Sequence, residues 1–218
     1  MRHDETVIPV GGSLVRAYRA GTGPDLVLLH GGEPSEAGGT GWAGAVSPAD
    51  TIGGTGCGGG TGLADLAGEP VLTGETSGLP GGARSAWEPV WTALSGRARV
   101  TAPDLPGFGG TPLGQVVPTP AGYAAWLACF LDACGIGPVR LAGLSLGSAI
   151  ALRAALDMPQ RITRLALCDP CGAEPAELTC PVLLTRGLPC RVPDVLVTFL
   201  TSASDQHEHD IKARTRLP

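Results

Sequence analysis

The sequence lacks an excess of basic residues, and it also lacks any long apolar run. Its 15 Lys and Arg residues are outnumbered by 20 Asp and Glu residues, which gives a formal net charge of −5. Such a chain offers no basic face to a phosphate backbone or an anionic lipid surface, so we expect neither nucleic acid nor a membrane as a partner. No stretch of about 18 apolar residues is present, and residues 1–10 lack the cationic and apolar parts of a secretion signal. We therefore expect a cytoplasmic protein whose partner is a small-molecule substrate.

Cysteine is present, but its pattern is not typical of a disulfide framework or of a zinc site. The 7 cysteines form an odd set in a chain without a secretion signal, which predicts reduced thiols. Cys168 and Cys171 form a Cys-x-x-Cys pair, but zinc needs a second close pair or nearby histidines. We therefore expect no metal site.

Large apolar side chains are nearly missing between residues 33 and 83. Glycine, of which the chain has 34, is concentrated here, and neither helical nor strand periodicity is visible. A segment of this composition cannot bury enough apolar surface to offset the backbone entropy lost on folding. We expect residues 33–83 to be a Gly-rich, disordered insertion in a single domain that spans residues 1–218.

Outside the insertion, short apolar runs alternate with helical patterns. The clearest helix begins at Pro120, where Thr119 can cap it, and Gly135 follows its end. Strand and helix alternate along the chain, which predicts an α/β fold with a mainly parallel sheet and helices on both faces. Strands are predicted within residues 7–20 (an antiparallel pair), 25–32, 97–109, 138–147, 162–170 and 180–187, and helices within 85–96, 119–137 and 147–159.

One motif places a nucleophilic side chain in the setting that its chemistry needs. Gly143-Leu144-Ser145-Leu146-Gly147 follows an apolar strand pattern and precedes an apolar helix pattern. A nucleophilic serine at a sharp strand-to-helix turn has a strained backbone, so the residues two before and two after it must be small. Gly143 and Gly147 meet this need, and the start of the helix would stabilise negative charge near Ser145. The motif predicts Ser145 as a nucleophile, and the alternative is a Gly-Ser turn that only starts a helix.

Together with two other segments, this motif resembles the α/β-hydrolase superfamily. His30-Gly31-Gly32 directly follows an apolar strand pattern, and residues 102–109 (APDLPGFG) look like the turn after the next strand. The resemblance covers most of residues 7–187 outside the insertion. It implies the α/β-hydrolase fold, with His30 holding a loop rather than moving protons.

The resemblance also implies which groups stabilise the reaction's negative charge. In this family the segment after the first inner strand and the residue after the nucleophile each supply a backbone N–H to an oxyanion hole. The matching donors here are Gly32 and Leu146.

The acid of the family is not at its usual place. The family usually carries an acid three residues after the glycine that ends the strand of residues 180–187, and Cys190 occupies that position. Asp194, a few residues further on, is one substitute. Asp169, which ends the preceding strand, is the other, although aspartate is also a common turn residue there. Both stay open.

The base is equally open. His207 and His209 are the only histidines after Ser145, and one of them must accept the serine proton if a catalytic triad exists. Neither lies in the Gly-His pattern of the family, and a pair of exposed tail histidines is the alternative. His207 is nearer to the last predicted strand.

The length of two connections also differs from the family. The superfamily usually inserts a helical cap after the strand that ends at Asp169, but only a short segment is present, so we expect no cap domain. After residue 187 the family needs a helix, a strand and a further helix, whereas residues 194–200 are the only apolar run. We expect a minimal fold or one truncated at its carboxyl end.

These patterns and the resemblance lead to one main function. We expect a serine hydrolase that cleaves small carboxylic esters or related acyl bonds through an acyl-enzyme on Ser145, with no metal and no organic cofactor. The alternative is a catalytically inactive or truncated α/β-hydrolase-like binding protein. A cofactor-free peroxidase or a C–C bond hydrolase on the same fold also stays open, because fold does not determine chemistry.

Overall fold

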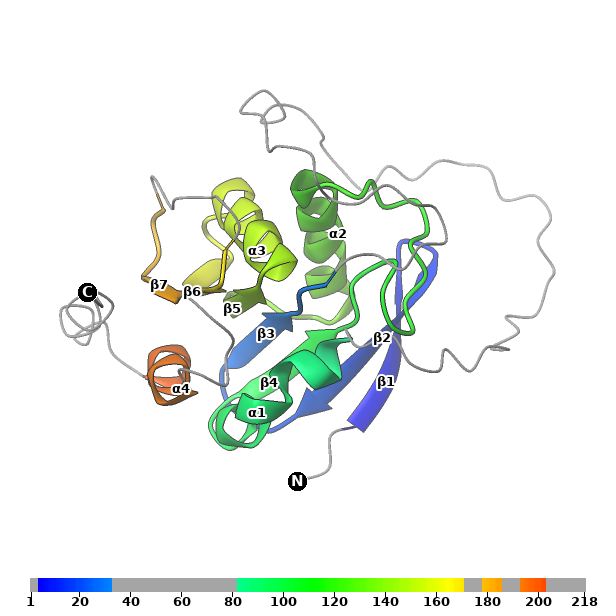
Figure 1. Cartoon of the computed structure of the whole chain (residues 1–218). Coiled ribbons are helices and arrows are strands. Elements are labelled where there is room, and N and C mark those ends of the chain that lie inside the picture. Colours follow the sequence, from blue (N-terminus) through cyan, green and yellow to red (C-terminus); the bar gives the residue numbers. More distant parts are fainter. Residues whose placement is uncertain (1–3, 33–81, 171–177, 186–192, 203–218) are drawn as a thin grey trace, which may run out of the picture.

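The computed structural model describes residues 4–32, 82–170, 178–185 and 193–202. Within these ranges, strands form one 7-stranded sheet with helices on both sides (Figure 1). The strands are β1 (Asp4–Val10), β2 (Ser13–Ala20), β3 (Asp25–Leu29), β4 (Arg99–Pro103), β5 (Val139–Leu144), β6 (Ile162–Cys168) and β7 (Val182–Thr185), and the helices are α1 (Ala83–Ser95), α2 (Pro120–Ala133), α3 (Leu146–Asp157) and α4 (Pro193–Thr201).

The sheet has the order β1-β2-β4-β3-β5-β6-β7. The hairpin β1–β2 and the pair β2–β4 are antiparallel, and all other neighbours are parallel. Because β3 and β5 are central parallel neighbours, the loops that follow them meet at one edge of the sheet. The predicted mainly parallel sheet is confirmed, and its carboxyl edge unites the predicted site segments.

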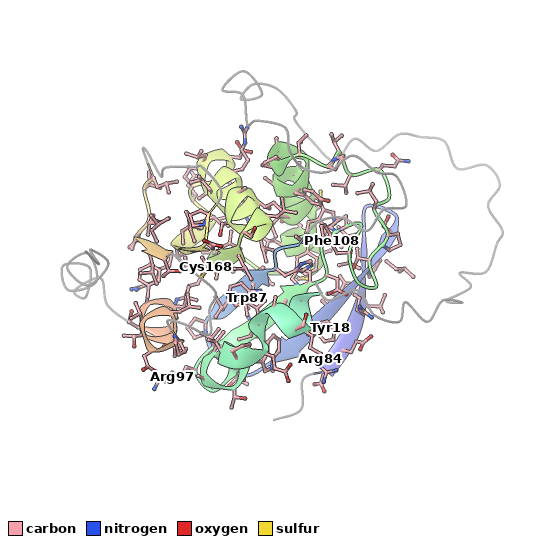
Figure 2. All side chains as sticks on the ribbon, in the orientation of Figure 1. Tyr18, Arg84, Trp87, Arg97, Phe108 and Cys168 are labelled. Carbon is pink, nitrogen blue, oxygen red and sulfur yellow. The ribbon has the colours of Figure 1, made fainter. Side chains whose placement is uncertain are left out.

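The helices divide the core into two layers. Helices α2 and α3 cover one face of the sheet, and α1 and α4 cover the other (Figure 1). Along β5, Val139 and Leu141 belong to the first layer, whereas Ala142 and Leu144 belong to the second. Trp87 of α1, labelled in Figure 2, is wholly buried in the second layer. Both faces of the inner strands are therefore buried, which explains their unbroken apolar runs.

Helix α2 begins and is anchored as its sequence predicts. The Oγ1 atom of Thr119 accepts a hydrogen bond from the Gly122 amide at 3.1 Å, and Pro120 occupies the first helical position. The Tyr123 hydroxyl donates to the Pro106 carbonyl at 3.0 Å, so the helix is tied to the turn after β4.

Helix α4 is held at its carboxyl end by two arginines that lie near the amino ends of neighbouring strands. Arg140 of β5 donates to the carbonyl oxygens of Leu200 and Ser202, and Arg164 of β6 donates to that of Phe199. Cations at a helix carboxyl end also complement its dipole. The residue that follows α4, Ser202, therefore lies toward the amino edge of the sheet, opposite the loops after β3 and β5.

The position of α4 differs from the expected continuation of the family fold. A right-handed crossover to a strand beyond β7 would place its helix on the face that α3 covers. Helix α4 lies on the other face, against α1. It is therefore not the crossover helix that the resemblance requires after residue 187.

Two further expectations change. The insertion was predicted to reach residue 83, but Ala83 already begins α1, so that boundary is too late; residues 33–81 lie outside the described ranges. Cys134, Cys168 and Cys180 are free thiols, whereas Cys129 is disulfide-bonded, so the prediction of reduced thiols is wrong for Cys129.

Candidate active site

Ser145 occupies a strained turn between β5 and α3. Its φ of 51° and ψ of −112° lie outside the regions that residues other than glycine normally adopt. The first turn of the helix closes directly after Ser145, because the amide of Ser148 donates to the Ser145 carbonyl at 2.9 Å. The side chain is half-buried at the carboxyl edge of the sheet. The backbone therefore has the sharp turn that the motif predicts.

The two glycines of the motif are required by close contacts on either side of this turn. A Cβ atom at Gly143 would overlap the backbone of Gly147 and lie 2.5 Å from the amide nitrogen of Ser148. A Cβ atom at Gly147 would lie 2.7 Å from the His30 carbonyl oxygen and nearer still to that of Leu29. The start of α3 is thus pressed against both β5 and the end of β3.

The loop after β3 lies directly beside Ser145. A Cβ atom at Gly31 would lie 2.9 Å from the Cβ atom of Ser145 and 2.9 Å from the Leu144 carbonyl oxygen. Gly32 follows with a φ of 121°, a conformation that favours glycine. Leu146 is the first residue of α3. Gly32 and Leu146, the two predicted oxyanion donors, are therefore each within one residue of a position that contacts or adjoins Ser145.

His30 is buried below this loop and both of its ring nitrogens have partners. Nε2 accepts a hydrogen bond from the Leu105 amide at 2.9 Å, and Nδ1 lies 2.8 Å from the Gly31 carbonyl oxygen. Phe108, labelled in Figure 2, contacts the ring edge-on at 5.2 Å between centroids. Burial lowers the pKa of His30, so the ring is neutral. These contacts agree with the expected structural role of His30.

Asp104 is a supporting residue that sequence reasoning missed. Its carboxylate is fully buried and forms an ion pair with Arg16 of β2 at 2.6 Å. It also accepts hydrogen bonds from the amides of Ala83 and Gly110, each at 2.9 Å. One side chain thus joins β2, the start of α1 and the turn after β4. The only sequence signal was an acid at the end of a strand, which is common in turns.

Ser148 is a second residue that the sequence did not single out. Its buried hydroxyl lies 2.7 Å from the Gly143 carbonyl oxygen and 2.9 Å from that of Cys168. The amide of Ser145 also donates to the Cys168 carbonyl at 2.9 Å. The turn that carries Ser145 is therefore fastened to the end of β6 as well as to β5.

The pairing of β5 with β6 also places the backbone of Asp169 near Ser145. Leu144 and Cys168 are partners in the parallel pair β5–β6, so the residues that follow them leave the sheet side by side. Asp169 also has a φ of 51°, its amide donates to the Thr185 carbonyl at 2.8 Å, and its side chain is exposed. Aspartate adopts a positive φ at turns more readily than most residues, so this backbone is also typical of a strand-end turn.

Asp194 has a different setting. It lies in the first turn of α4, where its exposed carboxylate complements the positive end of the helix dipole. Strand register places the backbone of Asp169 beside Ser145, whereas Asp194 begins a helix that packs against α1.

The remaining predicted residues cannot be placed. His207 and His209 lie outside the described residues, as does Cys190. Among the described residues, His30 is the only histidine, and it is fully engaged.

The described part of the chain has no group of three or more His, Cys, Asp and Glu side chains suited to a metal ion. None of the helices in those ranges has the length and apolar character needed to cross a membrane.

Comparisons with known proteins point to one superfamily. A family model described as the alpha/beta hydrolase fold matches residues 77–183. The 2-hydroxy-6-oxo-2,4-heptadienoate hydrolase of Pseudomonas putida is 36% identical over 132 residues, which are 59% of this chain and 47% of that protein. The dihydrolipoyllysine-residue acetyltransferase component of the acetoin cleaving system of Cupriavidus necator is 38% identical over 73 residues, which are 34% of this chain and 20% of that protein.

A solved structure shows the same fold. A serine hydrolase involved in carbazole degradation (CarC enzyme) superposes with a TM-score of 0.55 at 21% identity, covering 79% of this chain and 50% of that one. The chain thus spans at most half the length of these relatives.

Proposed function

Because the chain belongs to the α/β-hydrolase superfamily, we propose that it is a serine hydrolase in which Ser145 cleaves small carboxylic esters or related acyl bonds through an acyl-enzyme. The observation that carries the proposal is the strained backbone of Ser145, at φ 51° between β5 and α3 with the Gly31 loop against its Cβ atom. Such a turn lifts a serine hydroxyl out of the sheet edge beside backbone amides.

The proposed reaction has two steps. The Ser145 Oγ atom attacks the carbonyl carbon of the substrate, and its proton passes to an imidazole, which returns it to the departing alkoxide. The amides of Gly32 and Leu146 donate hydrogen bonds to the oxyanion that forms on the carbonyl oxygen. Water, deprotonated by the same imidazole, then attacks the acyl-enzyme and releases the acid and free Ser145. No metal or organic cofactor takes part.

We assign the acid role to Asp169 in preference to Asp194. The carboxylate must orient an imidazole that also reaches the serine, and Asp169 leaves the sheet beside Ser145. Asp194 instead lies in the first turn of α4 and not at the end of a strand that pairs with β5.

The base role belongs to His207 or His209, the two histidines that follow Ser145 in the sequence and that lie outside the described residues.

A second candidate is cleavage of a C–C bond on the same fold. One match, over 132 residues, is to a hydrolase named for 2-hydroxy-6-oxo-2,4-heptadienoate. Attack on a carbonyl carbon beside a C–C bond would use the same serine and the same oxyanion donors. The candidates differ only in the leaving group.

The third candidate is an inactive, α/β-hydrolase-like binding protein. It is favoured by the engagement of both ring nitrogens of His30, the only histidine of the described ranges. The cytoplasmic location and the small-molecule partner remain predictions.

Steady-state turnover separates these candidates. We expect the native chain to hydrolyse p-nitrophenyl acetate and Ser145→Ala to lose at least about 1,000-fold in kcat/KM, because removal of a serine nucleophile can cost about 10⁶-fold. Ser85→Ala is the matched control, because Ser85 is an exposed serine of α1 whose hydroxyl donates to the Gly82 carbonyl within the same helix start. A parallel assay with 2-hydroxy-6-oxo-2,4-heptadienoate tests the C–C candidate. Equal rates for native chain and Ser145→Ala on both substrates would favour the inactive protein.

A further inference from the structure

We propose that the amino edge of the sheet holds a binding site for the phosphate group of a small organic molecule, with Arg140 and Arg164 as the residues that bind it. Both arginines line a groove of about 740 Å³. They lie near the amino ends of β5 and β6, whereas Ser145 follows the carboxyl end of β5. The groove is therefore at the edge of the sheet opposite Ser145, and the proposal does not depend on the proposed function.

The two arginines are direct neighbours on one face of the sheet. Arg140 of β5 and Arg164 of β6 are partners in the parallel pair, so their side chains leave the same face of strands that are about 4.8 Å apart. Like charges at opposed positions in a sheet destabilise it. Arg164 is only 7% exposed and Arg140 is half-buried, so water and salt screen this repulsion poorly. An anion bound between the two side chains would remove the cost.

The helix end that both arginines contact does not balance their charge. There they donate to the carbonyl oxygens of Phe199, Leu200 and Ser202, and a helix carboxyl end carries about half a negative charge, which is less than the charge of Arg140 alone. Within the described part of the chain, Arg140 forms no ion pair with a carboxylate. Burial, and then the charge of Arg164, lower the pKa of Arg140, as expected where positive charge is in excess.

Positive charge also predominates in the rest of the groove. The described lining contains one carboxylate, Asp25, and Arg99 already neutralises it through two hydrogen bonds of 2.6 and 2.8 Å. The arginines are the only charged donors of this lining. It also includes four residues that have a fixed φ and no N–H to donate, namely Pro24, Pro138, Pro159 and Pro181. Charge-assisted hydrogen bonds to a ligand must therefore come from guanidinium groups.

Arg140 has donors that α4 does not use. A guanidinium carries five N–H groups, and the bonds to α4 occupy one on each terminal nitrogen of Arg140. Two guanidinium groups on neighbouring strands can each bind a different pair of oxygens of one phosphate, whereas a carboxylate has a single pair. Pockets for small molecules have volumes of about 300–1,000 Å³, so the groove also has room for an organic group esterified to the phosphate.

Titration of the full chain with inorganic phosphate, phenyl phosphate and acetate tests the proposal. Calorimetry at constant ionic strength measures the affinities, and ¹H–¹⁵N spectra of the arginine Nε–H groups locate the site. We expect phosphate to bind saturably and to shift the Arg140 Nε–H signal. Phenyl phosphate should bind more tightly than inorganic phosphate, because its ring also occupies the groove, and acetate should bind more weakly.

One substitution and a matched control isolate the groove from net charge. Arg140→Gln keeps an amide donor for α4 and removes the charge. We expect it to weaken phosphate binding at least about tenfold, because hydrogen bonds to charged groups contribute that factor or more. Arg153→Gln removes the same charge from α3, outside the groove, where Arg153 pairs with Asp157. This variant should bind phosphate within about twofold of the native chain, since salt screens distant surface charges.

Each outcome supports or overturns the site. Lack of saturable phosphate binding, signal shifts that sodium chloride reproduces, or equal weakening by both substitutions would overturn it. Acetate that binds as tightly as phosphate would overturn the assignment of a phosphate group, and phenyl phosphate that binds more weakly than inorganic phosphate would overturn the assignment of an ester. If Arg140→Gln does not fold, the native chain decides, because a saturable shift of the Arg140 Nε–H signal supports the proposal and an unchanged signal contradicts it.

Discussion

Replacement of Gly147 by alanine should damage the fold and the site together. The added methyl group would lie 2.7 Å from the His30 carbonyl oxygen and nearer still to that of Leu29. Both oxygens belong to backbone and cannot rotate away, so the start of α3 must move. Overpacking of this kind costs about 1–3 kcal/mol, and the helix propensity gained by replacing glycine offsets at most about 1 kcal/mol.

The same displacement should reduce reactivity. Ser145 immediately precedes α3 and the Gly31 loop immediately follows β3, so a shift between these elements changes the distance from the proposed nucleophile, Ser145, to the proposed oxyanion donor, Gly32. A misplacement of about 1 Å can cost about 100-fold in rate. We therefore expect Gly147→Ala to lose roughly 1–2 kcal/mol of unfolding free energy and about 100-fold in fluorophosphonate labelling rate.

Gly137→Ala is the matched control. No atom lies within 4 Å of a Cβ atom at Gly137, and its φ is not in the left-handed region. This variant should be neutral or gain about 0.4–1 kcal/mol, because alanine restricts the unfolded chain. Urea unfolding followed by tryptophan fluorescence measures both variants. If Gly147→Ala proved as stable and as reactive as Gly137→Ala, the proposed contact between α3 and β3 would be wrong.

Three further predictions follow from the buried and strained residues. Asp104→Asn should lower the unfolding free energy by about 3–5 kcal/mol, because it breaks a buried ion pair. The control is Asp157→Asn, which removes the more exposed i,i+4 pair with Arg153 and should change the unfolding free energy by less than about 0.5 kcal/mol. Burial lowers the pKa of His30 in the folded chain, so as the pH falls this histidine is protonated in the unfolded chain before it is protonated in the folded one. Urea unfolding should therefore show an unfolding free energy that decreases below about pH 6.5. His30→Gln should not show this decrease. Asp169→Asn should leave stability unchanged, because asparagine tolerates a positive φ, and should lower kcat for p-nitrophenyl acetate at least about 100-fold, whereas Asp194→Asn should retain activity.

Each of these predictions has a contradicting result. Equal effects of the Asp104 and Asp157 substitutions would show that the buried carboxylate is not the centre of its network. An unaltered pH profile in His30→Gln would show that the buried His30 ring is not the source of the pH dependence. Loss of turnover in Asp194→Asn alone would reverse our choice of acid.

Features that depend on residues close together in the sequence, such as turns and helix caps, could be predicted from the sequence. The predicted α/β-hydrolase fold is confirmed, and so is the sharp turn at Ser145, because small residues at Gly143 and Gly147 are a local requirement of that turn. The cap of α2 at Thr119 was predictable for the same reason.

The supporting contacts were not predictable in this way. Asp104 binds Arg16, which is 88 positions away in the sequence, and Ser148 binds Cys168, which is 20 positions away. Neither spacing belongs to a helix or a turn, so no local pattern marks these residues. The face of the sheet that α4 covers depends likewise on Arg140 and Arg164, whose partners only the folded sheet brings together.

The central claim is that Ser145 is an activated nucleophile, and site mapping of a covalent adduct tests it most directly. The folded chain is treated with a fluorophosphonate, digested and analysed by mass spectrometry, with heat-denatured chain as the reference. We predict one phosphonyl adduct, on Ser145, that disappears on denaturation. An unmodified Ser145 in folded protein, or equal modification before and after denaturation, would contradict the account.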